Sequence, residues 1–166
     1  SRARQLGPGL ERSFSLEGWA DFDAALWAEE DQRARNREQR QQTLPPIIGN
    51  EQDPAIAEQA RSNVEAAGLS DCITIQCGDF RELDFPPGPG TLVCNPPYGV
   101  RVGDYDGLDA LYSDLGAMVK TKASGWDAWI LSGNAGVTGA LRMKASRRIP
   151  ISNGGIDCRW LLYQVR

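Results

Sequence analysis

A short apolar run leads into two consecutive prolines in the segment Thr91-Leu92-Val93-Cys94-Asn95-Pro96-Pro97-Tyr98-Gly99. Residues 91–94 have the composition of a β-strand, and the prolines require the chain to leave the sheet and turn directly after Asn95. In an open α/β sheet, ligands bind where such strands end. The segment therefore predicts an α/β fold with a binding site after this strand.

Residues Asn95, Pro96, Pro97 and Tyr98 are the candidate catalytic residues. Because prolines have no N–H group and a fixed φ, the carbonyl groups of Asn95 and Pro96 have few internal partners. Together with the Asn95 side-chain oxygen, the Pro96 carbonyl can accept both hydrogens of a nucleobase amine, while Tyr98 offers a stacking surface. Gly99 allows close approach of the backbone. The pattern indicates amine methylation; the alternative is a simple turn in which Tyr98 is a half-buried cap.

The composition limits the other possibilities. The chain has 166 residues and a hydrophobic fraction of 41%, which fits one domain with a core. It has no histidine, which excludes Ser-His and Cys-His nucleophiles and imidazole metal sites. No stretch approaches the ~20 apolar residues of a membrane span, and residues 1–10 do not resemble a signal peptide. We therefore expect a cytoplasmic protein that binds no metal and no membrane.

The cysteines and the charges add two further expectations. The cysteines form no Cys-x-x-Cys pair, so we expect reduced core residues at Cys72, Cys77, Cys94 and Cys158. Residues 47–115 hold three Arg or Lys against twelve Asp or Glu, whereas residues 116–166 hold eight against two. The basic residues of the second part are candidates for phosphate contacts or form an ordinary solvated face: Arg142, Lys144, Arg147, Arg148 and Arg159.

Apolar periodicity predicts strands that alternate with helices, which is typical of a parallel α/β sheet. Helices are expected at 21–42, with a polar second half, from Pro54 to Gly68, from about 108 to 122, and near 137–141. Strands are expected at 47–51 (buried), 72–77, 91–95, 129–131 (buried), 143–149 and 158–165. The last two are expected to pair antiparallel. Asp53 and Pro54 form a typical helix start, and Gly68 a typical helix stop.

The candidate cofactor-binding residues are Glu51, Asp79, Phe80 and Asn95. In nucleotide-binding α/β folds, an acidic residue after the second strand accepts hydrogen bonds from ribose hydroxyls. Glu51 occupies that place; Asp53 competes, but its helix-capping role already explains it. After the next strand, Asp79 can accept a hydrogen bond from an adenine amine and Phe80 can pack on the adenine ring. The alternative for these two residues is a Gly-Asp turn followed by a core phenylalanine.

The chain resembles the class I S-adenosylmethionine-dependent RNA methyltransferases that carry a THUMP domain, particularly those that modify a guanine amine in large-subunit ribosomal RNA. The resemblance covers nearly the whole chain and rests on Gly7-Pro8-Gly9-Leu10, Gly18-Trp19, Gly49-Asn50-Glu51-Gln52-Asp53-Pro54, Asn95-Pro96-Pro97-Tyr98-Gly99, Gly125-Trp126 and Asn153-Gly154-Gly155-Ile156-Asp157-Cys158. It implies a Rossmann-like sheet flanked by helices, S-adenosylmethionine as cofactor, and methyl transfer to the N2 amine of a flipped guanine held by Asn95 and Pro96 and stacked on Tyr98.

The chain departs from this family in one respect. In the family, the first strand and its Gly-rich loop lie before the Gly7-Pro8-Gly9-Leu10 segment, and no Gly-x-Gly pattern follows a strand before residue 47 in this chain. We therefore expect residues 1–166 to be a partial catalytic domain, with a helical lead-in at 1–46 and an α/β core at 47–166, from the C-terminal part of a longer protein. Loss of the first strand would leave inner sheet edges unpaired, so we expect the isolated chain to bind cofactor weakly and to be inactive.

Two groups of alternatives remain open from the sequence. An Asn-Pro-Pro-Tyr site also suits methylation of adenine N6 in RNA or DNA, or of a protein glutamine amide. A non-catalytic RNA-binding or assembly module is the alternative of another class. If the substrate is RNA, we expect contacts through the missing N-terminal domain and through the basic residues of the C-terminal part.

Overall fold

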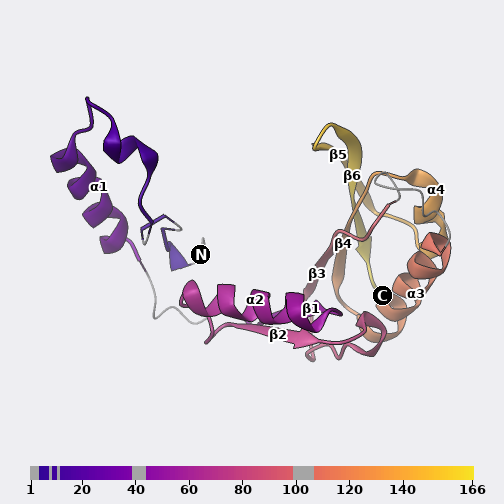
Figure 1. The fold of residues 1–166 in the computed structure, drawn as a ribbon. Helices are drawn as coiled ribbons and strands as arrows, with labels where there is room; N and C mark the ends of the chain where they lie inside the picture. Colours follow the sequence, from indigo (N-terminus) through magenta and orange to yellow (C-terminus); the bar gives the residue numbers. More distant parts are fainter. Residues whose placement is uncertain (1–3, 8, 11, 39–43, 99–106) are drawn as a thin grey trace. The chain divides into compact units, whose positions relative to one another are not determined.

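A computed structural model describes residues 4–7, 9–10, 12–38, 44–98 and 107–166. The chain divides into two compact units, Ser1–Asp79 and Phe80–Arg166, each of which is described by itself (Figure 1). The first unit contains η2 (Ser15–Gly18), α1 (Ala24–Asn36), β1 (Ile47–Glu51), α2 (Pro54–Ala66) and β2 (Ile73–Cys77). The second contains η3 (Phe80–Glu82), β3 (Thr91–Cys94), α3 (Leu108–Lys122), β4 (Asp127–Ser132), α4 (Ala135–Thr138), η4 (Gly139–Leu141), β5 (Arg147–Asn153) and β6 (Ile156–Gln164).

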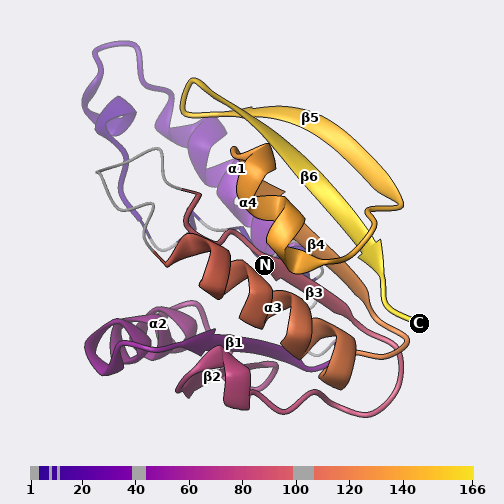
Figure 2. The same ribbon diagram turned by 90° about the vertical axis from the view of Figure 1, so that its right-hand side faces the viewer.

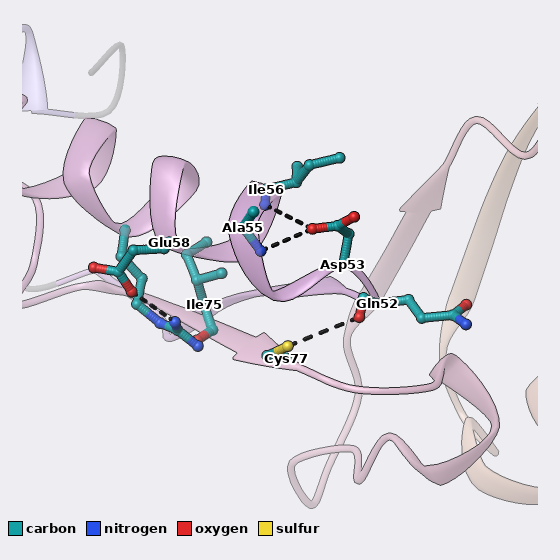
Figure 3. Close-up of polar contacts among 8 residues, drawn as sticks. Gln52, Asp53, Ala55, Ile56, Glu58, Ile75 and Cys77 are labelled. Carbon is teal, nitrogen blue, oxygen red and sulfur yellow. Dashed lines mark hydrogen bonds and ion pairs between the residues drawn. The ribbon is translucent and has the colours of Figure 1, made fainter.

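Local signals determine the ends of α2 in the first unit. The Asp53 carboxylate accepts hydrogen bonds from the backbone N–H groups of Ala55 (2.8 Å) and Ile56 (3.1 Å), as Figure 3 shows. Pro54 occupies the first turn, and Gly68 follows the helix with a φ of +64°. The predicted start and stop of this helix are therefore confirmed.

Helix α1 is shorter than the predicted helix at 21–42. It begins at Ala24, where the Asp23 side chain caps it, and ends at Asn36. Residues 39–42, which the prediction included, lie outside the described residues. None of its residues is buried, and Arg33 pairs with Glu29 and Glu30 along its surface. A largely polar helix with pairs at these spacings is typical of a solvent-exposed helix.

Strands β1 and β2 form a two-stranded parallel sheet, with Ile47 opposite Ile73 and Glu51 opposite Cys77. Both strands are where the sequence predicts them. The prediction that β1 is buried was wrong, because Ile47 is 47% exposed and the rest of the strand is only half-buried. Among the described residues β1 pairs with β2 alone, so its other edge has no partner strand.

The second unit contains a four-stranded sheet in the order β3-β4-β6-β5. Strand β3 runs parallel to β4, while β6 is antiparallel to both of its neighbours. Helices α3 and α4 cover one face (Figure 2), and a core of buried residues lies between them and the sheet, including Tyr112, Val119, Ile130, Leu141, Leu161 and Tyr163. The mixed α/β class is confirmed. The strands form two sheets, and in the described part of the chain β3 pairs with β4 alone.

One prediction in this unit needs correction. The strand expected at 143–149 is β5, which begins four residues later and contains Pro150. Proline is compatible with β5 because this strand lies at the sheet edge, where an N–H group can be dispensed with. The antiparallel pairing of β5 and β6 is confirmed, and a turn at Gly154 and Gly155 with φ of +60° and +82° joins them.

The cysteines only partly match the expectation of core residues. All four are free thiols, and Cys158 is buried. Cys72 and Cys94 are half-buried, whereas Cys77 at the end of β2 is exposed. The core prediction was therefore wrong for Cys77, which ends a strand of the two-stranded sheet.

Candidate active site

The candidate catalytic residues follow β3 directly. The strand ends at Cys94, and Asn95, Pro96, Pro97 and Tyr98 continue as irregular backbone, which confirms the predicted exit from the sheet. Asn95 is exposed and Tyr98 is half-buried, while Gly99 lies outside the described residues. Burial raises the pKa of the Cys94 thiol to about 11, so the last residue of the strand is a neutral thiol at physiological pH. An exposed amide thus stands beside an apolar strand end.

Tyr98 is held by two segments that are distant in the sequence. The side-chain amide of Asn153, at the end of β5, donates a hydrogen bond to the Tyr98 hydroxyl at 3.1 Å. A Cβ atom at Gly133 would lie 2.9 Å from the Tyr98 ring and 3.2 Å from the Cys158 Sγ, so only glycine permits this close packing. The Tyr98 ring is therefore positioned by the segment after β4 and by the β5–β6 hairpin.

The segment after β4 has its own internal order. The buried Ser132 hydroxyl accepts from the Asn134 N–H at 3.2 Å and donates to the Asn134 carbonyl at 3.1 Å. The Asn134 side chain accepts from the Gly136 N–H at 2.9 Å and so caps α4. These bonds fix the backbone on both sides of Gly133, against which Tyr98 packs.

The sequence prediction missed Gly133 and Asn153 as site residues. A signal existed for Asn153, since Asn153-Gly154-Gly155 has the composition of a tight hairpin turn. Its contact with a tyrosine 55 positions earlier depends on the strand order, which the composition does not reveal. For Gly133 the position after a buried strand was the one available signal.

Two of the candidate cofactor residues lie in the first unit, at the same end of its sheet. Glu51 ends β1 and Asp79 comes two residues after β2. The Gly78 N–H donates to the Glu51 carbonyl at 3.0 Å, which ties the two strand ends together. The Glu51 Oε1 accepts from the Asp53 N–H at 2.9 Å. Because the Asp53 carboxylate caps α2, Glu51 is the better candidate for a ribose contact.

Carboxylates at the ends of parallel strands fit the polar half of an adenosine group. They are acceptors, and ribose hydroxyls and an adenine amine are donors. Open space borders Gly78, where a Cβ atom would meet nothing within 4 Å. The residues present therefore fit the adenosine part of the cofactor. Before Ile47, no described residue forms a strand, so the described residues do not supply the strand and Gly-rich loop that would hold the remainder of the cofactor.

Phe80 and Asn95 belong to the second unit. Phe80 begins η3 and packs against the hydrophobic core, and the Arg81 guanidinium lies 5.3 Å from the centre of its ring. The ring therefore has a structural role, and its contact with a cofactor stays a prediction.

A groove of about 780 Å³ lies beside the Tyr98 site in the second unit. Its walls come from the segment after β4, from α4 and from the β5–β6 hairpin, and they include Gly133, Asn134, Arg148, Asp157, Cys158 and Arg159. Within the described ranges, no helix has the length and apolar character needed to cross a membrane. The same residues contain no group of three His, Cys, Asp or Glu side chains placed to hold a metal ion.

Residues 3–161 match the family model described as "RMKL-like, methyltransferase domain". The chain belongs to this family of methyltransferase domains, which the sequence resemblance had indicated.

Curated relatives agree with this assignment. The chain is 34% identical over 161 residues to a Synechocystis protein provisionally named RNA methyltransferase slr0064, covering 96% of the chain and 42% of that protein. It is 35% identical over 159 residues to the ribosomal RNA large subunit methyltransferase K/L of Marinomonas, covering 93% of the chain and 22% of that protein. The chain thus spans less than half the length of these relatives.

Solved structures share the fold. The crystal structure of SMU.472 complexed with SAH has a TM-score of 0.86 and 25% identity, over 99% of this chain and 43% of that chain. A protein from Listeria monocytogenes, described as a predicted N6-adenine-specific DNA methylase, has a TM-score of 0.82 and 26% identity, over 99% of this chain and 42% of that chain.

Proposed function

We propose that the protein containing this chain is an S-adenosylmethionine-dependent RNA methyltransferase that methylates the N2 amine of a guanine in large-subunit ribosomal RNA. The observation that carries the proposal is the ordered Asn95-Pro96-Pro97-Tyr98 segment, with Tyr98 held by Gly133 and Asn153, in a chain of the methyltransferase-domain family. The name of the Marinomonas relative supports ribosomal RNA as the substrate.

The residues after β3 hold the target amine. The side-chain oxygen of the exposed Asn95 and the carbonyl of Pro96 accept its two hydrogens, which directs the nitrogen lone pair away from both acceptors. The target base leaves its stack and lies against the Tyr98 ring. Since Asn153 and Gly133 fix that ring, the base meets a preformed surface, and little ordering remains when the substrate binds.

The carboxylates of the first unit hold the cofactor's adenosine. Glu51 accepts from the ribose hydroxyls and Asp79 from the adenine amine. When bound, S-adenosylmethionine supplies an electrophilic methyl group on a sulfonium. Asn95 and the Pro96 carbonyl would present the guanine nitrogen to that methyl group, and the proton of the methylated nitrogen would leave to water. No described residue is required as a strong base, because the proton leaves a cationic nitrogen.

Nucleoside analysis after methylation tests this function. The complete gene product is incubated with methyl-labelled cofactor and ribosomal RNA, tRNA, DNA or release-factor protein. We expect N2-methylguanosine in ribosomal RNA, and a loss of about 100-fold or more in kcat/KM for Asn95→Ala. Asn36→Ala on the exposed helix α1 is the matched control and should retain activity. Methyl transfer only to DNA or protein would contradict the proposal.

Adenine N6 is the second candidate target. Its exocyclic amine also offers two hydrogens, and the Listeria structure with the same fold carries that description. N6-methyladenosine in place of N2-methylguanosine, in the same experiment, would favour this target. RNA binding with no methylation of any substrate would favour a non-catalytic module.

A further inference from the structure

The groove in the second unit has no role in the reaction described so far. It lies between α4 and the β5–β6 hairpin, and its volume of about 780 Å³ is within the range of small-molecule binding sites. Its lining includes the buried Leu161 and Tyr163 as well as the exposed Arg148, Asp157 and Arg159. A lining with both apolar and charged side chains suits a ligand that has a flat ring and an ionic group.

Two arginines stand close together on one face of the hairpin. Arg159 lies opposite Pro150 in the pairing of β6 with β5, and Arg148 comes two residues before Pro150, so both side chains share one face. Both line the groove and both are exposed. Neither forms an ion pair or a hydrogen bond within the part of the chain that the structure describes. A neighbouring pair of unpaired guanidinium groups favours an anion, and phosphate matches their geometry.

The neighbouring basic residue does not contribute to this groove. Arg147 pairs with Leu162, whereas Arg148 pairs with Leu161, and successive residues of a strand point to opposite faces. Arg147 does not line the groove, although both Arg147 and Arg148 are exposed. The two neighbouring arginines of β5 therefore lie on opposite faces of the hairpin, and only the face with Arg148 borders the groove.

The groove is continuous with the Tyr98 site. Gly133 lines the groove, and the Tyr98 ring packs against it; Cys158, which also lines the groove, lies beside the same glycine. A ligand in the groove would thus lie next to a base stacked on Tyr98. Consecutive nucleotides of one strand are joined by a single phosphate, and that group is the ligand that Arg148 and Arg159 favour.

We propose that this groove binds the nucleotide next to the methylated one in the RNA strand, with the guanidinium groups of Arg148 and Arg159 on its phosphate. The inference rests on the proposed function. Asp157, the one carboxylate among the described residues that line the groove, accepts a hydrogen bond from the 2′-hydroxyl, which distinguishes RNA from DNA.

The groove is tested in the complete gene product with a labelled single-stranded RNA decamer that contains one guanine. Fluorescence anisotropy measures its binding at several KCl concentrations. For Arg148→Gln/Arg159→Gln we expect binding about tenfold weaker and a slope of log K against log[KCl] smaller by about 1. Arg147→Gln removes a charge from the same strand on the other face, and its affinity should stay within about twofold of the original.

A steric variant tests the groove without a change of charge. A Cβ at Gly139, which lines the groove, would meet nothing within 4 Å, so the side chain of Gly139→Trp starts in open space and adds bulk to the groove. We expect weaker binding with an unchanged salt slope, and a melting temperature that shows the fold is intact. The same decamer made of DNA should bind more weakly than RNA, and Asp157→Asn should reduce that difference.

The outcomes separate the groove from the proposed function. If Arg148→Gln/Arg159→Gln and Gly139→Trp bind RNA as tightly as Arg147→Gln while the enzyme methylates RNA, the groove inference is wrong and the proposed function stands. If both groove variants lose RNA affinity but the original protein methylates no guanine, the groove is supported and the proposed function is wrong. Three results together would contradict recognition of an RNA nucleotide. They are equal affinity for the RNA and DNA decamers, displacement of the RNA by inorganic phosphate, and no effect of Asp157→Asn on either affinity.

Discussion

The two compact units differ in how completely they bury their strands. In Phe80–Arg166, α3, α4 and η4 pack on a four-stranded sheet, and Ile130, Leu141 and Val119 are fully buried. In Ser1–Asp79, α2 covers a two-stranded sheet, and Ala57 is the one buried residue of this helix. Ile47 in β1 and Ile56 in α2 are about half exposed. A two-stranded sheet has too little surface for a core of its own.

The candidate residues of the two units differ in the same way. Tyr98 and its supports belong to the unit with the large core, and Glu51 belongs to the unit with the small one. β1 and β3 each have one partner strand in the described part of the chain. The residues proposed for the target amine therefore have a well-packed scaffold, while the residues proposed for the cofactor's adenosine belong to a weakly covered sheet.

The largest expected effect concerns the core of the second unit. Leu141 is fully buried, so Leu141→Ala should lower the free energy of unfolding by about 2–5 kcal/mol. Ile56→Ala, at an exposed position in the first unit, should change it by less than about 1 kcal/mol. Urea denaturation followed by circular dichroism measures both. Equal losses for the two variants would contradict the contrast between the units.

The next effect concerns the packing of Tyr98. A Cβ at Gly133 would lie 2.9 Å from the Tyr98 ring, so Gly133→Ala should displace that ring. We expect kcat/KM for RNA to fall by about 10- to 100-fold in the complete protein, since a misplaced positioning group is costly. Gly18→Ala, where a Cβ would meet nothing within 4 Å, is the control. Unchanged activity of Gly133→Ala would show that Tyr98 does not hold the substrate.

A smaller effect is expected at the end of β5. Asn153→Ala removes the 3.1 Å hydrogen bond to the Tyr98 hydroxyl, at a cost of about 1 kcal/mol in kcat/KM, or roughly fivefold. Asn153→Asp should recover most of the activity, because the carboxylate can accept from the same hydroxyl. In a Tyr98→Phe background Asn153→Ala should have no further effect. Additive losses would mean that Asn153 acts elsewhere.

The smallest effects concern acidic groups that burial keeps neutral. Burial raises the pKa of Cys94 to about 11 and raises the pKa values of Tyr112 and Tyr163. In the unfolded chain these groups lose their protons at lower pH, so the second unit should lose stability between about pH 9 and 11. Melting temperatures across that range measure the loss.

Iodoacetamide at pH 8 should modify the exposed Cys77 much faster than Cys94.

Local signals in the sequence were sufficient for much of the fold. Asp53, Pro54 and Gly68 defined α2, and the apolar run before Asn95 located β3. The start of β5 was predicted wrongly, because Pro150 is acceptable only in an edge strand and the strand order is not a local property. For the same reason the sequence indicated Tyr98 as a candidate but not its contacts with Gly133 and Asn153, which depend on the arrangement of β4 and β5.

Calorimetric titration of residues 1–166 with S-adenosylmethionine tests most directly whether the candidate residues Glu51 and Asp79 are sufficient to hold the cofactor. With acidic residues for the adenosine but no Gly-rich loop after a first strand, we predict a Kd weaker than about 1 mM for this chain, against micromolar binding by the complete protein. Circular dichroism checks that residues 1–166 are folded. Micromolar binding to residues 1–166 would contradict the account.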